Sequence, residues 1–190
     1  FILIGATTQV LSAILFLPKH ADLIAERSKM QANTKPWDRV LAPLVSMVGP
    51  LALVLVGGLD ARFHWSAEPP LGLFLLAVLV GLGASIFVLW AMLTNRFFAA
   101  TVRIQEDRGH HVVDSGPYAI VRHPGYLGAV VYDLLVPLVL GSWWAFIPAV
   151  VTVALTFVRT ALEDRTLQAE LSGYAQYAQR IKFRLLPGIW

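Results

Sequence analysis

Long stretches of apolar residues alternate with short polar segments along the chain. The apolar stretches cover residues 1–17, 41–59, 71–93, 124–140 and 143–158. A helix needs roughly 20 residues to cross the hydrocarbon core of a bilayer, with about 17 as the short limit. The pattern therefore predicts about five transmembrane helices. The last two runs are short and are joined only by Gly141 and Ser142, so we expect them to form a tight antiparallel hairpin.

The composition agrees with a chain that lies in lipid. Of its 190 residues, 57% are hydrophobic and 14% are charged, whereas a soluble domain carries about 25% charged residues. The absence of cysteine excludes a disulfide framework, a thiol nucleophile and a thiolate metal site. We expect an all-α, polytopic membrane helical bundle that forms a single domain over residues 1–190.

Because residue 1 is Phe and not Met, we expect the numbered chain to begin inside a longer one. Its first apolar run is interpreted as a retained span, although its length also fits a signal-peptide core.

Basic residues gather in alternate loops. Lys and Arg are frequent in residues 18–40, in residues 94–126 and from Arg159 onward, whereas residues 60–70 contain only Arg62. Basic loops remain on the cytoplasmic side of a membrane. We therefore predict a multi-pass protein whose three basic segments face the cytoplasm. The net charge of +3 is modest and divided between apolar runs, which favours membrane lipids and not nucleic acid as partners.

The tail over residues 162–184 has the pattern of an amphipathic helix. Apolar residues recur at spacings of three and four, which is the helical period. They are Leu167, Leu171, Tyr174, Tyr177 and Ile181. We expect this helix to lie along the cytoplasmic face, either as a surface anchor or as a lid over a site.

A polar, turn-rich segment precedes the fourth apolar run. Residues 116–128 read GPYAIVRHPGYLG, in which Pro124 suits the first position of a helix. Arg122 and His123 then lie just outside a helix N-terminus, where free N–H groups and the helix dipole favour an anion. Arg122 alone would fit an anchor to a lipid phosphate. An imidazole beside it, followed by a proline and a tyrosine, indicates a binding site.

A second polar group follows the fifth run, where residues 157–171 read FVRTALEDRTLQAEL. Arg159 and Glu163 are four residues apart and share one helical face, which is the spacing of a simple ion pair. Such a pair is worth only about 0.3–0.5 kcal/mol when exposed. The functional alternative is a buried Arg159 that faces an anionic substrate group, with Glu163 accepting hydrogen bonds from a ligand.

Three further features carry weaker signals. Asp133 lies inside the fourth run, where a carboxylate is costly; it is interpreted as a structural hydrogen-bond partner before a functional group. His110 and His111 are adjacent without a third ligand at metal spacing, and no G-x-S-x-G motif occurs. Gly81 and Gly83 are interpreted as a helix-packing pair in the third run.

With these features in view, the sequence resembles the integral membrane methyltransferases of the isoprenylcysteine carboxyl methyltransferase and phospholipid methyltransferase superfamily. The resemblance covers roughly residues 95–190, and the first 90 residues match only in general topology. It rests on GPYAIVRHPGYLG, on Arg159 followed by EDRTLQAEL, and on Tyr174, Tyr177, Arg180 and the sequence Leu185-Leu186-Pro187.

The resemblance implies an enzyme that binds S-adenosyl-L-methionine between the loop and the C-terminal helix, while a lipophilic acceptor enters from the bilayer. Carried over by motif, Arg159 orients the acceptor and Glu163 binds the cofactor, so both are expected as catalytic residues. The expected cofactor contacts are Arg103, His110, His111, Val112, Val113, Tyr118, His123, Pro124, Gly125, Tyr126 and Glu163. Asp164 stands where the family often has a second glutamate. In the phospholipid branch a G-x-G in a span is implicated in cofactor binding, a role that Gly81 and Gly83 would fit.

Two other functions remain open from the sequence. One is an NADPH-dependent membrane reductase of the sterol reductase type, and the other is a non-catalytic membrane scaffold. The first three apolar runs are nearly bare of charge, which argues against holding a dinucleotide. The sequence leaves open whether the acceptor is a carboxylate, such as an isoprenylcysteine, or a phospholipid amine. It also leaves the oligomeric state open.

Overall fold

The computed structural model describes residues 33–190, and in that part of the chain every regular element is helical. The first predicted span, residues 1–17, lies outside the described residues. The main helices are α3 (Asp38–Pro43), α4 (Gly49–Phe63), α5 (Leu71–Thr94), α6 (Pro124–Leu140), α7 (Phe146–Glu170) and α8 (Tyr174–Arg180). Shorter elements are the π-helical turn η1 (Leu44–Val48) and the 3₁₀ turns η2 (Glu106–Arg108) and η3 (Gly116–Ala119).

The predicted apolar runs within residues 33–190 all form helices. Three helical segments are long and apolar enough to cross a membrane: Asp38–Phe63, which joins α3, η1 and α4, then Leu71–Thr94 and Phe146–Glu170. Pro124–Leu140 is a shorter apolar helix. Large apolar side chains such as Leu51, Leu55 and Leu79 are exposed on α4 and α5. A membrane helical bundle accounts for them, because they face lipid and not water.

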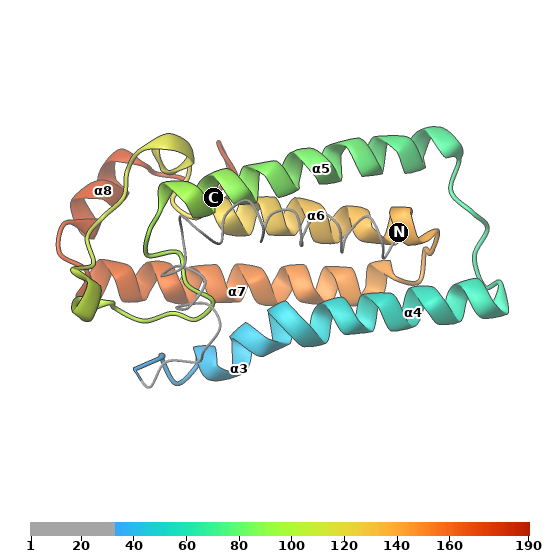
Figure 1. The fold of residues 1–190 in the computed structure, drawn as a ribbon, viewed down its shortest axis with the longest axis horizontal. Coiled ribbons are helices and arrows are strands. Elements are labelled where there is room, and N and C mark those ends of the chain that lie inside the picture. The colour runs from blue at the N-terminus through green and yellow to red at the C-terminus, as the bar shows by residue number, and fades with distance from the viewer. Residues whose placement is uncertain (1–32) are drawn as a thin grey trace, which may run out of the picture.

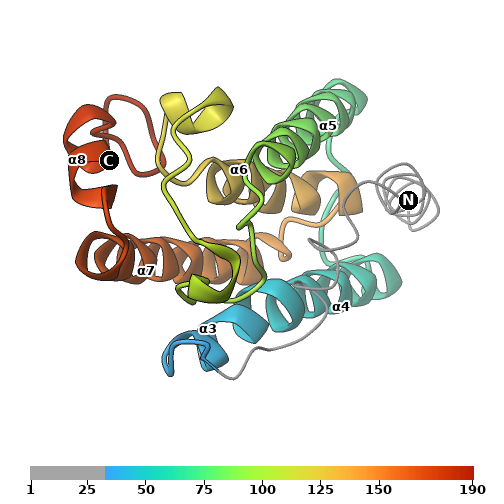
Figure 2. The ribbon, with the colours of Figure 1, turned by 60° about the vertical axis from the view of Figure 1, so that its left-hand side comes forward.

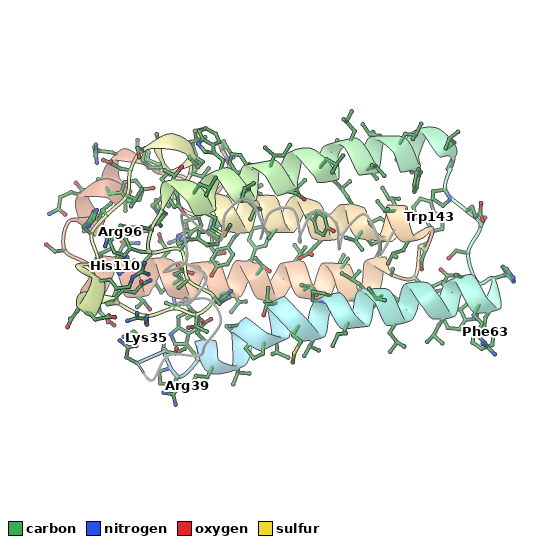
Figure 3. All side chains as sticks on the ribbon, viewed as in Figure 1. Lys35, Arg39, Phe63, Arg96, His110 and Trp143 are labelled. Atoms are coloured by element: carbon green, nitrogen blue, oxygen red, sulfur yellow. The ribbon has the colours of Figure 1, made fainter. Side chains whose placement is uncertain are left out.

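The helices run side by side along the long axis of the molecule, with their connections gathered at two ends (Figure 1). The α4–α5 connection and the α6–α7 hairpin lie at one end, and Phe63 and Trp143 mark it in Figure 3. The loop of residues 95–123, helix α8 and the C-terminal segment lie at the other end, together with Lys35, Arg96 and His110 (Figures 1 and 3). The described parts of the basic segments therefore share one end, as their alternation along the chain predicts.

The closest approach between α5 and α6 occurs at Gly128. A Cβ atom added to Gly128 would lie 2.5 Å from Val88 Cγ2 and 3.0 Å from the backbone oxygen of Ala84. A Cβ atom at Gly81 or Gly83 meets no described atom within 4 Å, although Gly81 is buried, so the packing role predicted for this pair stays a prediction. The small residue that permits the contact is on the partner helix α6.

A buried carboxylate connects the two hairpins at the end away from the basic loops. Asp60, at 2% exposure, accepts hydrogen bonds from Ser66 N at 2.8 Å and from Ser66 Oγ at 2.6 Å. The hydroxyl of Ser142 also donates to Asp60. These contacts hold the α4–α5 connection against the α6–α7 hairpin, so α4 and α7 keep a fixed relation.

The predicted single helix over residues 162–184 is wrong in its extent. Helix α7 continues to Glu170, the chain breaks at Gly173 with φ +82°, and α8 follows as a separate helix. The predicted apolar face does form: Leu171, Tyr174 and Tyr177 are buried in one cluster. They pack against Ile104 and Val112 of the long loop, so the tail covers that loop.

Candidate active site

A cavity of about 330 Å³ lies between the long loop, α6, α7 and α8. Small-molecule pockets are commonly of about 300–1,000 Å³. The structure brings every predicted site residue to its wall: Arg103, His110, His111, Val112, Val113, Tyr118, His123, Pro124, Gly125, Tyr126, Arg159 and Glu163. The cavity also extends into the bundle, where Val45, Val88, Ala129 and Asp133 line it. Gly81 and Gly83 are not among the lining residues.

The start of α6 determines which side chains reach the cavity. The helix begins at Pro124, where a missing N–H costs no hydrogen bond, and His123 stands immediately before it. Tyr126, Ala129 and Asp133 follow at spacings of three and four, so they lie on one face of α6. All three line the cavity. The periodicity of the helix thus carries polar groups from the loop end into the bundle.

Glu163 faces this row of side chains from α7. The Tyr126 hydroxyl donates a hydrogen bond to Glu163 Oε2 at 2.6 Å. The carboxylate is partly buried and lines the cavity. The Glu163 side chain is therefore held by a tyrosine and presented to the interior of the site.

Arg159 is not held in a simple ion pair with Glu163, as its spacing had suggested, but binds Asp38. Arg159 Nε lies 2.7 Å from Asp38 Oδ1, and Nη2 lies 3.0 Å from Oδ2. Nη2 also donates to the carbonyl of Ala100 at 2.7 Å, and the guanidinium lies 5.3 Å from the centre of the Tyr126 ring. Two parallel hydrogen bonds to a fully buried carboxylate hold the arginine in one geometry.

Asp38 is a residue of the site that the sequence did not indicate. It is fully buried in the first turn of α3 and also accepts a hydrogen bond from Val102 N at 2.6 Å. It lies 121 positions from Arg159 along the chain. No local pattern connects two residues so far apart, and only the fold brings them together.

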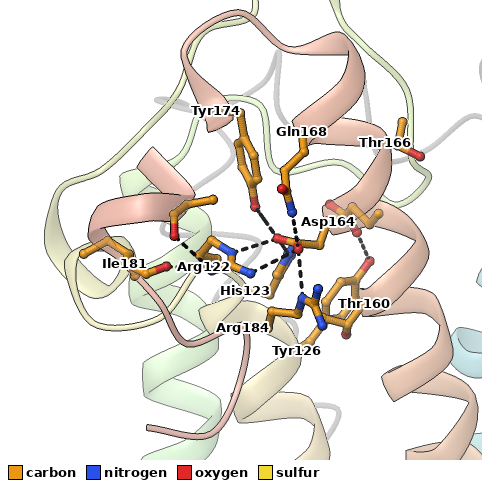
Figure 4. A network of polar contacts seen from close by, with 12 residues as sticks. Arg122, His123, Tyr126, Thr160, Asp164, Thr166, Gln168, Tyr174, Ile181 and Arg184 are labelled. Carbon is orange, nitrogen blue, oxygen red and sulfur yellow. Dashed lines mark hydrogen bonds and ion pairs between the residues drawn. The ribbon is translucent and has the colours of Figure 1, made fainter. Parts of the chain in front are cut away.

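Asp164 is the centre of a buried network of polar contacts (Figure 4). Its carboxylate accepts two hydrogen bonds from Arg122, at 2.8 and 3.1 Å, and one from Arg184 at 2.8 Å. Tyr174 and Gln168 donate to it at 3.1 and 2.7 Å, and a ring nitrogen of His123 lies 3.3 Å away. The network joins α7, α8, the loop before α6 and the C-terminal segment.

The anion that Arg122 binds is therefore internal, and its predicted anchoring to a lipid phosphate is wrong. The Arg122 side chain is only 6% exposed. Its Nη1 donates to the carbonyls of Ile181 and Lys182 at 2.7 and 3.0 Å. Figure 2 shows the C-terminal segment beside the loop that precedes α6. Arg122 N and His123 N donate to the carbonyls of Phe183 and Arg184, which continues the same contact in the backbone.

The long loop contributes a neutral imidazole to the cavity. His110 Nδ1 accepts a hydrogen bond from Gln105 N at 3.3 Å, a role that requires an unprotonated nitrogen. Burial, followed by the charges of His111 and Arg103, lowers the pKa of His110 to about 4. The rings of His110 and His111 both contact Phe97, with centroids 4.6 and 4.8 Å away. Within residues 33–190 no group of side chains is arranged to hold a metal ion.

Two tyrosines close the loop side of the cavity. The Tyr177 hydroxyl of α8 donates to the carbonyl of Tyr118 at 2.8 Å. Burial raises the pKa of both tyrosines, so each hydroxyl remains a neutral group. Arg103, also on the wall, donates to Asp107 at 2.7 Å.

The π-helical turn η1 shapes the opposite, membrane end of the cavity. It follows Pro43, which cannot supply an N–H to a regular helix, and it presents Val45 and Ser46 to the cavity. Insertions of this kind occur often at functional sites. Val88 of α5 and Ala129 of α6 complete an apolar wall there. The cavity therefore has a polar end at the loop and a largely apolar end in the bundle, where Ser46 and Asp133 are polar exceptions.

Comparison with known proteins gives one family. The model of the Isoprenylcysteine carboxyl methyltransferase (ICMT) family matches residues 75–169. This stretch begins in α5, includes the long loop and α6, and ends at the penultimate residue of α7, so it contains every predicted site residue. No curated protein matches the chain.

Proposed function

Since the chain belongs to the isoprenylcysteine carboxyl methyltransferase family, we propose that it transfers a methyl group from S-adenosylmethionine to a lipophilic acceptor at the cytoplasmic face of the membrane. The cavity is the observation that supports this best. It connects polar groups at the basic end of the bundle with an apolar wall between the spans. A water-soluble methyl donor and a lipid-like acceptor need a meeting place of this kind.

The polar end of the cavity fits the donor. S-adenosylmethionine supplies a methyl group that is already activated by a sulfonium charge. Glu163 offers an opposite charge to that group, and the Tyr126 hydroxyl holds the carboxylate at 2.6 Å. The aromatic ring of Tyr118 and the backbone of residues 110–113 offer apolar and hydrogen-bonding surface for a nucleoside. We assign the donor to this end, with Arg103 and residues 123–126 completing its wall.

Methyl transfer of this kind depends mainly on alignment and on the exclusion of water. The buried cluster of Leu171, Tyr174 and Tyr177 covers the cavity from the side of α8. Asp164 holds α8 and the C-terminal segment in that position through Tyr174 and Arg184. We assign Arg159, fixed by Asp38, to the boundary between donor and acceptor.

The apolar end is assigned to the acceptor. Val45, Val88 and Ala129 come from three different helices and give an acyl or prenyl chain an apolar wall. An acceptor that enters from the bilayer would place its reactive head toward Arg159 and Glu163. The family match gives no support to the reductase that the sequence left open.

The first experiment measures the thermal stability of the detergent-solubilised protein with and without S-adenosylhomocysteine. A ligand that binds only the folded state at 100 times its Kd adds about 2.7 kcal/mol of stability. We expect this increase in the wild type and in Glu170→Ala, which removes an exposed carboxylate of α7 that pairs with Lys35. We expect most of the increase to be lost in Glu163→Gln, which keeps the shape of the side chain without its charge.

Two results would contradict the proposal. A folded wild type that gains no stability at millimolar S-adenosylhomocysteine would remove the methyltransferase function and favour a scaffold. An equal gain in the wild type and Glu163→Gln would remove Glu163 from the donor site.

A further inference from the structure

We infer that Asp38 is a positioning residue for the proposed reaction: its carboxylate holds Arg159 away from Glu163, and so leaves Glu163 to meet the positive charge of the methyl donor. The inference rests on the proposed function, because it treats Glu163 as a group of the donor site. Asp38 lies outside residues 75–169, the stretch that matches the family.

Arg159 and Glu163 are close enough on α7 to form an ion pair with each other. They are four residues apart, and both line the cavity. Side chains at this spacing are neighbours on a helix surface, with Cβ atoms about 5–6 Å apart. A guanidinium can bind both oxygens of a carboxylate. An arginine bound to Glu163 in this way would cancel the charge that a cationic ligand needs.

Asp38 gives Arg159 a different anionic partner, from another helix. Its two oxygens lie 2.7 Å from Arg159 Nε and 3.0 Å from Nη2, so both edges of the contact are occupied. The carbonyl of Ala100 accepts a further hydrogen bond from Nη2 at 2.7 Å. Asp38 is fully buried and is not on the cavity wall. It therefore acts on the site through Arg159.

Tyr126 occupies the space between the two α7 side chains. The Arg159 guanidinium lies 5.3 Å from the centre of its ring, and its hydroxyl donates to Glu163 Oε2 at 2.6 Å. The hydroxyl is a neutral donor, which leaves the charge of a carboxylate uncancelled. Arg159 thus has an anionic partner, whereas Glu163 has a neutral one.

Asp38 also makes a contact that would give it a purely structural function. Its Oδ2 accepts a hydrogen bond from Val102 N at 2.6 Å, and Val102 O accepts one from Lys35 N at 2.9 Å. These bonds hold the long loop against the segment before α3. If this were the whole function of Asp38, its loss would weaken every ligand of the donor site alike. A test must therefore ask whether the charge of the ligand matters.

Two ligands that differ at one position make this test. S-adenosylhomocysteine has a neutral sulfur where the donor has its sulfonium, and sinefungin has a protonated amine on carbon there. Their Kd values are measured by calorimetric titration of the full chain in detergent. We expect the wild type to bind sinefungin more tightly. We expect Asp38→Asn to reduce the ratio of the two Kd values about tenfold, because close charge pairs across a binding site couple by at least this factor.

A second substitution separates the freed arginine from a loosened loop. The double variant Asp38→Asn, Arg159→Gln removes both charges, so it leaves neither of them buried without a partner. We expect its preference for sinefungin to return to that of the wild type. Glu170→Gln is the matched control, because it removes a negative charge where α7 meets Lys35 and leaves the partner of Arg159 in place. We expect it to keep the wild-type ratio.

The outcomes separate this inference from the proposed function. A wild type that binds neither ligand would overturn both. Equal binding of the two ligands by the wild type, or a wild-type ratio in Asp38→Asn, would overturn the inference while the donor site stands. A double variant without the preference would also overturn it. That last comparison decides the matter even if Asp38→Asn alone does not fold, since a double variant that keeps the preference shows that Asp38 is needed only beside Arg159.

Discussion

Neighbouring carboxylates on α7 have different functions in this protein. Glu163 and Asp164 are separated by about 100° around a helix, since one turn takes 3.6 residues. Glu163 consequently faces the cavity, whereas Asp164 faces Arg122, Arg184 and Tyr174 and is fully buried. The shorter side chain at 164 is matched to a crowded internal network and not to a ligand.

The Asp164→Asn substitution tests the structural function of this carboxylate. It keeps the size of the side chain and removes the charge that balances Arg122 in the interior. Breaking a buried ion pair on one side costs about 3–5 kcal/mol, because the remaining charge stays buried without its partner. We expect a loss of this size in the free energy of unfolding, measured by chemical denaturation in detergent micelles.

Lys35→Gln provides a comparison at an exposed ion pair. Lys35 and Glu170 are 2.6 Å apart, but their side chains are 26% and 44% exposed. Exposed pairs contribute about 0–1 kcal/mol. A loss in Asp164→Asn no larger than that in Lys35→Gln would contradict the function assigned to the network.

At the scale of the elements, the contact between α5 and α6 determines the shape of the cavity. Both helices contribute to its apolar end, through Val88 on α5 and Ala129 on α6. The absence of a side chain at Gly128 allows the backbone of α5 near Ala84 to approach. Membrane helices associate closely where a small residue permits it.

Gly128→Ala is expected to weaken this contact. The added Cβ atom would lie 2.5 Å from a methyl group of Val88 and 3.0 Å from a backbone oxygen that cannot move independently. Overpacking in a well-packed interior costs about 1–3 kcal/mol. We expect the free energy of unfolding, measured by chemical denaturation in detergent micelles, to fall by an amount in this range.

Gly83→Ala is the control, since it adds the same methyl group to α5 where no described atom lies within 4 Å. Alanine is favoured over glycine in a helix by about 1 kcal/mol, so stability should be unchanged or higher. Equal losses in both variants would show that helix propensity, and not the α5–α6 contact, governs position 128.

At the scale of the whole molecule, the two ends of the bundle differ in chemistry. The site and the long basic loop are at one end, and the α4–α5 connection with its aromatic residues is at the other (Figure 3). Glu106 belongs to the first end and Glu68 to the second, and both are exposed. The cysteine-free chain allows each position to be labelled singly.

We expect Glu68→Cys to react with a membrane-impermeant maleimide in intact cells, and Glu106→Cys to react only after the membrane is opened. The physical reason is the retention of basic loops on the cytoplasmic side. Labelling is quantified by a mass shift on a gel, with the unmodified cysteine-free chain as the background. The reverse pattern would place the site on the opposite face of the membrane.

The helices within residues 33–190 follow from the sequence because their cause is local. A run of apolar residues long enough to cross the bilayer must satisfy its own backbone hydrogen bonds, and a helix does so within one segment. Two other local patterns also predicted the structure. Pro124 begins α6, where its missing N–H costs no hydrogen bond, and the described parts of the basic segments lie at one end of the bundle. The extent of the tail helix was predicted wrongly, because the apolar period continues through the break at Gly173, where φ is +82°.

For the candidate site, the sequence predicted which residues line the cavity but not which residues they bind. Motif and spacing indicated the residues from Arg103 to Glu163 that line the cavity. They could not show that Arg159 binds Asp38 or that Asp164 binds Arg122 and Arg184. Spacing along a helix decides which face a side chain is on, whereas its partner comes from another part of the chain.

The sequence by itself therefore determined the class of the fold, the end of the bundle that carries polar chemistry and the side chains available there. The tertiary structure decided which charges cancel one another and which remain directed into the cavity. The physical reason is that charge compensation depends on distances of about 3 Å between groups far apart in sequence, whereas hydrophobicity and helical period are properties of neighbouring residues.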